Sequence, residues 1–223
     1  MGLIQLSHIT KSYPDGENKR NFVLSDLNME VAAGEFVAIM GASGSGKTTL
    51  LSVLGLLLMP EEGSYRFENR EMLTADIDQA AIRNRKIGFV FQEHRLLPQF
   101  TAIDNILLPT LASQSQANED QTSYARELMR LTGIADLAAK YPPTLSGGES
   151  SRTALCRALV MAPSLLLADE PTGQLDAVNS HNIVSLLKQV NKELGTTILM
   201  VTHSGEVASA AGRILTLDNG AIK

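Results

Sequence analysis

Four short apolar runs stand out along the chain. They are Phe36–Met40, Ile87–Phe91, Leu165–Ala168 and Thr197–Val201. Each is four or five residues long and almost wholly apolar, a pattern typical of strands that are buried on both faces of a sheet. The sequence therefore predicts an α/β core built around a buried sheet.

The leucines that follow the first run predict a helix. Their spacing places five apolar side chains on one helical face. These leucines are Leu50, Leu51, Leu54, Leu57 and Leu58. A strand followed directly by a helix indicates a βαβ unit.

The middle of the chain has a different pattern. Residues 100–145 contain no comparable apolar run, whereas Tyr124, Leu128 and Leu131 keep helical spacing. We therefore expect a helical subdomain over about residues 93–159, inserted into a single α/β domain.

Composition narrows the classes of partner. The chain has 223 residues, with 19 Lys and Arg against 24 Asp and Glu, a net charge of −5. This balance argues against a nucleic-acid partner and against attraction to an anionic bilayer. Cys156 is the only cysteine, so no intrachain disulfide can form, which suits a reducing compartment.

No segment predicts export or membrane insertion. Residues 1–11 alternate apolar and polar side chains, without a charged leader or an apolar h-region. The most apolar stretch, Leu50–Met59, is about half the ~20 residues that a membrane-spanning helix needs, and Pro60 ends it. We expect any membrane role to depend on a partner.

The strongest chemical signal lies between the first run and its helix. Residues 41–48 read Gly-Ala-Ser-Gly-Ser-Gly-Lys-Thr, which matches the phosphate-binding pattern G-x-x-x-x-G-K-[ST]. Glycines let successive backbone N–H groups surround a phosphate. Lys47 would reach the β- and γ-phosphates of ATP, and the Thr48 hydroxyl would bind Mg²⁺. The predicted ATP-binding residues here are Gly41, Ala42, Ser43, Gly44, Ser45, Gly46, Lys47, Thr48 and Thr49.

Two acidic residues supply the remaining chemistry of hydrolysis. The third apolar run delivers Asp169 to the end of a buried strand, where its carboxylate can hold Mg²⁺. Glu170 follows, and it can act as the general base for the attacking water. Adjacent acids at a strand end can also be only a turn, but the phosphate-binding loop favours the catalytic interpretation.

Two further segments fit a nucleotide site. The glycine turn of Leu145–Glu149 precedes a predicted helix, and such a helix start binds anions. His203 lies just beyond the fourth run and could bond the γ-phosphate and the attacking water. A lone histidine is more often structural, but its place after a buried strand favours the catalytic role.

This ordered set of motifs resembles ABC transporter ATPases over essentially the whole chain. The resemblance implies a RecA-like P-loop NTPase core, approximately residues 1–92 and 160–223, with an antiparallel β-subdomain and an inserted α-helical signature subdomain. It also implies a homodimer. Two copies face each other head to tail, and each ATP lies between the Gly41–Thr49 loop of one copy and residues 146–149 of the other.

The resemblance also assigns roles residue by residue. Tyr13 would stack on adenine, Gln92 would link the Mg²⁺ site to the helical subdomain, and His203 would be the switch histidine. Catalysis would involve Glu170, His203 and Lys47, and the metal would be held by Thr48, Gln92 and Asp169. The residues implied to act on the partner copy's ATP are Ser146, Gly147, Gly148, Glu149 and Asp176.

Three segments resemble a narrower group. Phe89–Pro98, Asn105–Pro109 and Leu167–Gly173 are similar to the LolD lipoprotein-release ATPases and the MacB-type efflux ATPases. That similarity implies integral membrane permease subunits that dock near Gln92–Phe100, and a peripheral location on the cytoplasmic face of the inner membrane. The FtsE cell-division ATPase is an alternative with a similar loop.

A soluble ABC ATPase that remodels DNA or ribosomes is a second alternative. Its DNA-associated members insert long coiled coils, and its ribosomal members carry two ATPase domains. Here only a short helical stretch separates Gln92 from Leu145, and there is one phosphate-binding loop. Transport is therefore the favoured interpretation.

The chain departs from the family pattern at four positions. Ser150 and Ser151 stand where glutamines are usual, Gln174 stands where asparagine is common, and Ser204 stands where aspartate is frequent. These departures leave the phosphate ligands and the base in place. The two serines put ribose contacts in doubt.

Overall fold

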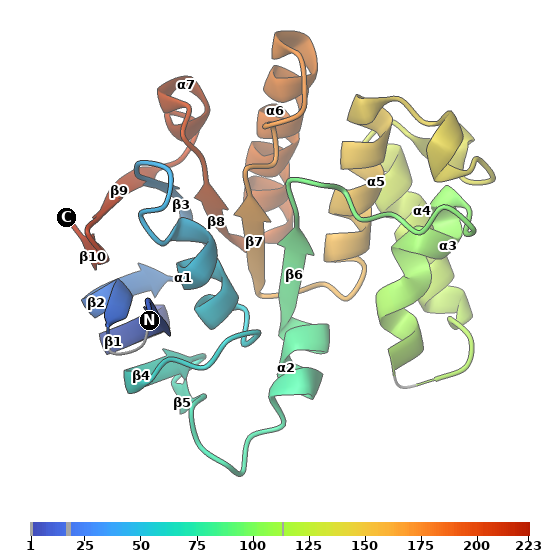
Figure 1. Cartoon of the computed structure of the whole chain (residues 1–223). Helices are drawn as coiled ribbons and strands as arrows, with labels where there is room; N and C mark the ends of the chain where they lie inside the picture. Colours follow the sequence, from blue (N-terminus) through green and yellow to red (C-terminus); the bar gives the residue numbers. More distant parts are fainter. Residues whose placement is uncertain (1, 17–18, 113) are drawn as a thin grey trace.

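The chain folds around two β-sheets (Figure 1). The computed structural model describes residues 2–16, 19–112 and 114–223. An antiparallel sheet has the strand order β2-β1-β4-β5, and a larger sheet has the order β10-β9-β3-β8-β7-β6. Their bounds are β1 Gly2–Pro14, β2 Arg20–Ala32, β3 Phe36–Met40, β4 Glu62–Phe67, β5 Arg70–Glu71, β6 Ile87–Val90, β7 Leu165–Asp169, β8 Thr197–Val201, β9 Arg213–Asp218 and β10 Ala221–Ile222.

The four apolar runs form neighbouring strands of the larger sheet. They are β3, β8, β7 and β6, and each pairs with the next in parallel. Side chains alternate between two apolar cores, so that Leu165 and Leu167 of β7 face one core and Leu166 and Ala168 face the other. Burial on both faces explains why these runs are almost continuously apolar.

Helices cover both faces of this sheet. Helix α1 and the antiparallel sheet pack on one face, and residues of α3, α4, α5 and α6 pack on the other. The α-helices are α1 Lys47–Leu54, α2 Gln79–Lys86, α3 Ala102–Leu107, α4 Glu119–Leu131, α5 Gly147–Leu159, α6 Ala177–Leu194 and α7 Gly205–Ala208. The 3₁₀-helices are η1 Leu108–Ala112, η2 Ala135–Leu137 and η3 Pro142–Thr144.

The predicted helix after β3 is shorter than its leucine spacing suggested. Helix α1 ends at Leu54, so Leu57 and Leu58 lie beyond it, and Leu57 is 53% exposed. Gly55 ends the helix against the ring of Phe89, which fills the space of any side chain at that position. Leu56 then adopts a left-handed conformation, with φ of 55°, which turns the chain away from the helix axis.

Helices α3, α4 and α5 form a group beside the edge strand β6, away from α1 (Figure 1). All three begin with a capping box, in which an N-cap side chain and the third helical residue satisfy each other's backbone N–H groups. The C-terminal end of α5 packs closely on β6, because the carbonyl oxygen of Ala158 occupies the space that a side chain on Gly88 would need. Among the described helices, none combines the length and the apolarity that a membrane crossing requires.

We predict that Gly88→Ala lowers the free energy of unfolding by about 1–3 kcal/mol, the usual cost of overpacking a core. The new methyl group would meet backbone atoms of α5, which cannot rotate away as a side chain can. Chemical denaturation of the purified chain measures this change. The matched control is Gly205→Ala, where the added carbon has no heavy atom within 4 Å. Equal stability of the two variants would contradict this close packing.

Candidate functional site

Four neighbouring strands deliver the predicted site segments to one edge of the larger sheet. The glycine-rich loop follows β3, His203 follows β8, Asp169 and Glu170 stand at the end of β7, and Gln92 follows β6. Parallel strands end on the same side, and the carboxyl edge of such a sheet is where ligands bind in α/β folds. Segments that lie far apart in sequence therefore meet.

The glycine-rich loop is shaped by positions that exclude side chains. Gly46 is the N-cap of α1 with φ of 100°, and a side chain there would meet the carbonyl oxygen of Val23 at 2.6 Å. Lys47 is buried, and its Nζ donates hydrogen bonds to the carbonyl oxygens of Gly41 and Ala42, at 2.9 and 2.7 Å. The lysine is thus held within the loop.

A cavity of 460 Å³ lies over this loop. It brings together loop residues, one residue of β2 and the two predicted catalytic residues beyond β7 and β8. Its lining residues are Val23, Ser43, Gly44, Gly46, Lys47, Thr48, Thr49, Glu170 and His203. The cavity therefore combines the Lys47 side chain, the N-terminus of α1 and the Glu170 carboxylate. Phosphate binding and hydrolysis require such a combination.

Asp169 faces the start of α1. The Thr48 hydroxyl donates a hydrogen bond to its Oδ2 at 3.3 Å. Burial raises the pKa of Asp169 and the neighbouring Glu170 carboxylate adds to this, while the Thr48 hydrogen bond and the Lys47 charge oppose it. A carboxylate whose charge is penalised in this way gains from a nearby cation, and hydroxyl and carboxylate oxygens are the ligands that Mg²⁺ prefers.

Glu170 and His203 contact each other at the mouth of the cavity. The Nδ1 of His203 lies 3.1 Å from Oε2 of Glu170, and the histidine side chain is 69% exposed. Glu170 has φ of 44°, a left-handed conformation that is uncommon for residues other than glycine. Its N–H donates to the carbonyl oxygen of Val201 on the neighbouring strand at 3.0 Å. This backbone geometry is strained, as often occurs at functional positions.

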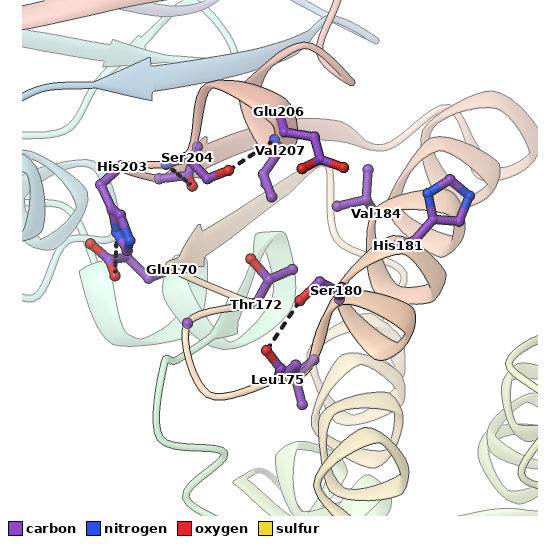
Figure 2. A pocket seen from close by; sticks show the side chains of 13 residues that line it. Glu170, Thr172, Leu175, Ser180, His181, Val184, His203, Ser204, Glu206 and Val207 are labelled. Atoms are coloured by element: carbon purple, nitrogen blue, oxygen red, sulfur yellow. Dashed lines mark hydrogen bonds and ion pairs between the residues drawn. The ribbon is translucent and has the colours of Figure 1, made fainter.

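A second cleft, of 340 Å³, adjoins the first and shares Glu170 and His203 with it (Figure 2). Thr172, Ser180, His181 and Glu206 are among its other lining residues. Ser204, the departure after His203, lies in this cleft and caps the short helix α7. Its Oγ accepts the Val207 N–H at 3.3 Å, and its own N–H donates to Oγ1 of Thr202 at 3.1 Å. Serine therefore has a local role at this position.

Gln92 lies close to the catalytic pair. A side chain on Gly173 would meet Nε2 of Gln92 at 3.1 Å and Oε2 of Glu170 at 3.4 Å. The glutamine amide and the glutamate carboxylate thus flank the same glycine. The link of Gln92 to the metal site stays a prediction.

The predicted signature residues form a separate arrangement. Oγ of Ser146 accepts the Glu149 N–H at 3.3 Å, and Oε2 of Glu149 accepts the Ser146 N–H at 2.7 Å. The backbone hydrogen bond from Ser146 is the main cause that lowers the pKa of Glu149. Among the described residues that line the loop cavity, none comes from residues 146–149. The loop cavity is therefore formed without the signature residues of the same chain.

Asp176 connects the signature helix to α6. It is the N-cap of α6, and its carboxylate accepts the backbone N–H and the side-chain Nδ2 of Asn179, both at 2.8 Å. Oδ1 of Asn179 occupies the space of any side chain on Gly148. Sequence reasoning did not identify Asn179, although an aspartate three residues before it is a helix-capping pattern.

Tyr13 and Val23 show where sequence reasoning was incomplete. Tyr13 is partly exposed at the end of β1, where it pairs with Asn21 of β2, but it is not among the described residues that line the loop cavity. Val23, further along β2, does line it. No local sequence signal marks Val23, because its position depends on strand packing. Adenine stacking by Tyr13 stays a prediction.

Known proteins are similar to this chain over most or all of its length. The sequence-family model described as ABC transporter matches residues 24–173. The lipoprotein-releasing system ATP-binding protein LolD of Bordetella pertussis is 45% identical to this chain over 222 residues, which cover 99% of this chain and 95% of that protein. The macrolide export ATP-binding/permease protein MacB of Syntrophobacter fumaroxidans is 43% identical over 225 residues, which cover 100% of this chain and 31% of that protein.

A solved structure extends the similarity to three dimensions. The ATP-binding cassette MJ0796, a dimer in a post-hydrolysis state bound to ADP and Pi, matches this chain with a TM-score of 0.88. The two are 38% identical, and the match covers 99% of this chain and 96% of that one. The similarity therefore includes the helical group as well as both sheets.

Proposed function

Because this chain belongs to the ABC transporter family and hydrolyses ATP as the cassettes of that family do, we propose that it works as a homodimer driving an integral membrane partner in lipoprotein release or efflux. The fold is the expected ABC cassette. The relatives named for lipoprotein release and macrolide export favour this function over a cell-division role. The observation that carries the proposal is the shared cavity of the glycine-rich loop, Glu170 and His203.

In the proposed mechanism, the loop binds the phosphates of ATP. On binding, Lys47 exchanges its contacts with the Gly41 and Ala42 carbonyl oxygens for the β- and γ-phosphates. Thr48 and Asp169 would hold Mg²⁺, because their hydroxyl and carboxylate oxygens face each other at the start of α1. Gln92, whose side chain lies with that of Glu170 beside Gly173, would contribute its amide oxygen. When bound, the ion neutralises charge on the phosphate oxygens.

Hydrolysis is then assigned to the pair at the cavity mouth. Glu170 accepts a proton from the attacking water as general base. His203 holds the Glu170 carboxylate through its Nδ1 contact and is exposed enough to reach the γ-phosphate. The left-handed backbone of Glu170 fixes where the carboxylate begins, which supports a positioned base.

Dimerisation would complete the site. Residues 146–149 do not line the loop cavity of their own chain, yet the backbone N–H groups of Gly147 and Gly148, at the start of α5, form a suitable anion site. The dimeric MJ0796 cassette bound to ADP and Pi supports this arrangement. In the proposed dimer, residues 146–149 and Asp176 of one copy face the ATP of the other.

The membrane partner is proposed to be a separate permease subunit. LolD, of which this chain covers 95%, is named an ATP-binding protein, whereas the MacB relative, of which it covers 31%, is named an ATP-binding/permease protein. This chain therefore corresponds to the ATP-binding part. Assembly with the permease would place it on the cytoplasmic face of the inner membrane.

Residues 92–100, named here the docking segment, are built to receive such a partner. The buried Asn105 holds the segment's backbone, since its Oδ1 accepts the Leu97 N–H at 2.7 Å and its Nδ2 donates to the carbonyl oxygens of Leu97 and Phe100 at 3.0 Å. The side chains of Leu97 and Phe100 remain 38% exposed. The backbone is thus fixed while apolar side chains face solvent.

A groove of 770 Å³ adjoins the docking segment. Its apolar lining includes Phe89, Phe91 and Leu111, and three arginines, Arg83, Arg95 and Arg157, add positive charge. We expect it to receive a short cytoplasmic helix of the permease that carries apolar and acidic side chains, because such a helix matches both features.

We predict that replacing Leu97 and Phe100 together by aspartate abolishes assembly with the permease while ATP binding by the isolated chain is retained. Charges in an apolar contact would lose hydration without a partner, whereas the Asn105 hydrogen bonds to the backbone are unchanged. Copurification from detergent-solubilised membranes, with identification of the partner by mass spectrometry, is measured alongside nucleotide binding and thermal unfolding.

Leu194→Asp is the matched control, because Leu194 is similarly exposed, at 40%, but lies at the end of α6. It is expected to keep the partner. Full recovery of the permease by the double variant would remove the docking segment from the interface. Joint loss of folding and ATP binding would mean that Leu97 and Phe100 serve mainly to pack the helical group.

A further inference from the structure

A buried serine joins the signature helix to the docking segment. Nε2 of His94 lies 2.6 Å from Oγ of Ser151, and the same Oγ lies 3.0 Å from the carbonyl oxygen of Gly147. Ser151 is only 2% exposed. The contact therefore connects a residue of the docking segment with the first residue of α5 through one side chain.

Hydrogen-bond chemistry gives this contact a direction. The carbonyl oxygen of Gly147 can only accept, so the Ser151 hydroxyl donates to it. Oγ of Ser151 then accepts a hydrogen bond from Nε2–H of His94. Both contacts are satisfied together only in this arrangement, in which His94 donates to Ser151 and Ser151 donates to Gly147.

A second attachment keeps the docking segment on α5. The guanidinium of Arg157 donates to the carbonyl oxygens of His94 and Arg95, both at 2.7 Å. Arg95 is left-handed, with φ of 50°, and its guanidinium lies 4.3 Å from the ring centroid of Phe91. These contacts fasten the segment's turn to the last turn of α5, so His94 is held both there and, through Ser151, at the first turn of the same helix.

We propose that Ser151 is a positioning residue that couples the docking segment to the N-terminus of α5, where Gly147 faces the partner copy's ATP. The inference rests on the proposed function of both ends. It depends on one of the departures from the family pattern, because the short Ser151 side chain contacts both Gly147 and His94 from a position that is only 2% exposed. Serine is the size that lets both contacts form.

Coupling of this kind is reciprocal. If a movement of the docking segment changes the position of α5 through Ser151, then ATP bound against α5 must also change the local stability of the docking segment. This consequence can be measured in the chain alone, without the permease. The reporter is the exchange of backbone amide hydrogens, which responds to local opening of each segment.

The experiment uses the full chain with Glu170→Gln, which is expected to retain ATP, and measures amide exchange with and without ATP. ATP should slow exchange at residues 146–150 and, by about twofold or more, at residues 93–97. Adding Ser151→Ala should preserve the first effect and remove the second. Ser151→Thr, which keeps the hydroxyl, should restore the slower exchange at residues 93–97. His94→Leu, which removes the other partner of the contact, should abolish it as Ser151→Ala does.

Ser150→Ala is the matched control, because Ser150 is the neighbouring serine on α5 and the described residues give its side chain no hydrogen bond. It should retain both effects. Persistent protection of residues 93–97 in Ser151→Ala, with residues 146–150 still protected, would overturn the coupling role alone. Lack of ATP-dependent protection at both segments in the Glu170→Gln chain would overturn the proposed dimer, and this inference with it.

Discussion

Glu170→Gln is expected to reduce ATP hydrolysis by ~10²–10⁴, the range usually lost with a positioned general base, while ATP binding is retained. Glutamine has nearly the shape of glutamate and can keep the contact with His203, but its amide cannot accept the proton from water. Nucleotide-bound dimers should therefore accumulate. Phosphate release and size-exclusion chromatography with ATP measure the two effects.

Glu206→Gln is the control for that experiment. Glu206 lines the adjoining cleft of Figure 2 and carries the same charge, but it does not line the loop cavity. Its variant should hydrolyse ATP at the parental rate. Parental turnover by Glu170→Gln would show that another group activates the water.

Mixing two inactive variants is expected to restore hydrolysis, because each site is proposed to combine two copies. Lys47→Ala removes the cation that reaches the phosphates, and Gly147→Asp places a carboxylate where the γ-phosphate should approach α5. Each alone should lose nearly all hydrolysis. An equal mixture forms heterodimers with one intact composite site, so about a quarter of parental activity should return if sites act independently.

Gly147→Asp is expected to leave the packing of the chain undisturbed. The nearest atom to an added carbon on Gly147 is Cδ2 of Leu175 at 3.5 Å, an ordinary contact, whereas the same carbon on Gly148 would collide with Asn179. Gly147→Asp should therefore fold, and thermal unfolding checks this. Full activity of either variant alone, or a mixture no more active than its parts, would contradict the shared site.

Much of the catalytic site could be predicted because its residues are covalent neighbours of buried strands. Asp169, Glu170 and His203 each follow an apolar run within two residues. In an α/β fold the carboxyl ends of the parallel strands lie along one edge of the sheet, where ligands bind. The order in which those strands pair could not be predicted, because β3 and β7 are separated in the sheet by β8, which comes later in the chain.

Contacts made by packing escaped the sequence analysis. The leucine spacing suggested a helix that included Leu57 and Leu58, because periodicity does not detect the ring of Phe89 that meets Gly55. Ser151 was identified only as a departure. Its neighbour His94 is 57 residues away in sequence, and no local pattern reveals such a distance.

The close contact between Gly88 and Ala158 has a mechanical consequence. It holds the C-terminal end of α5 against the sheet, and Gly147 lies eleven residues, about 16 Å, along the helix from that contact. A swing of α5 by about 10° would carry Gly147 by about 3 Å while Ala158 stayed nearly in place. Any turn of α5 about this contact would therefore shift the predicted ATP contact at Gly147 far more than the end of the helix that packs on Gly88.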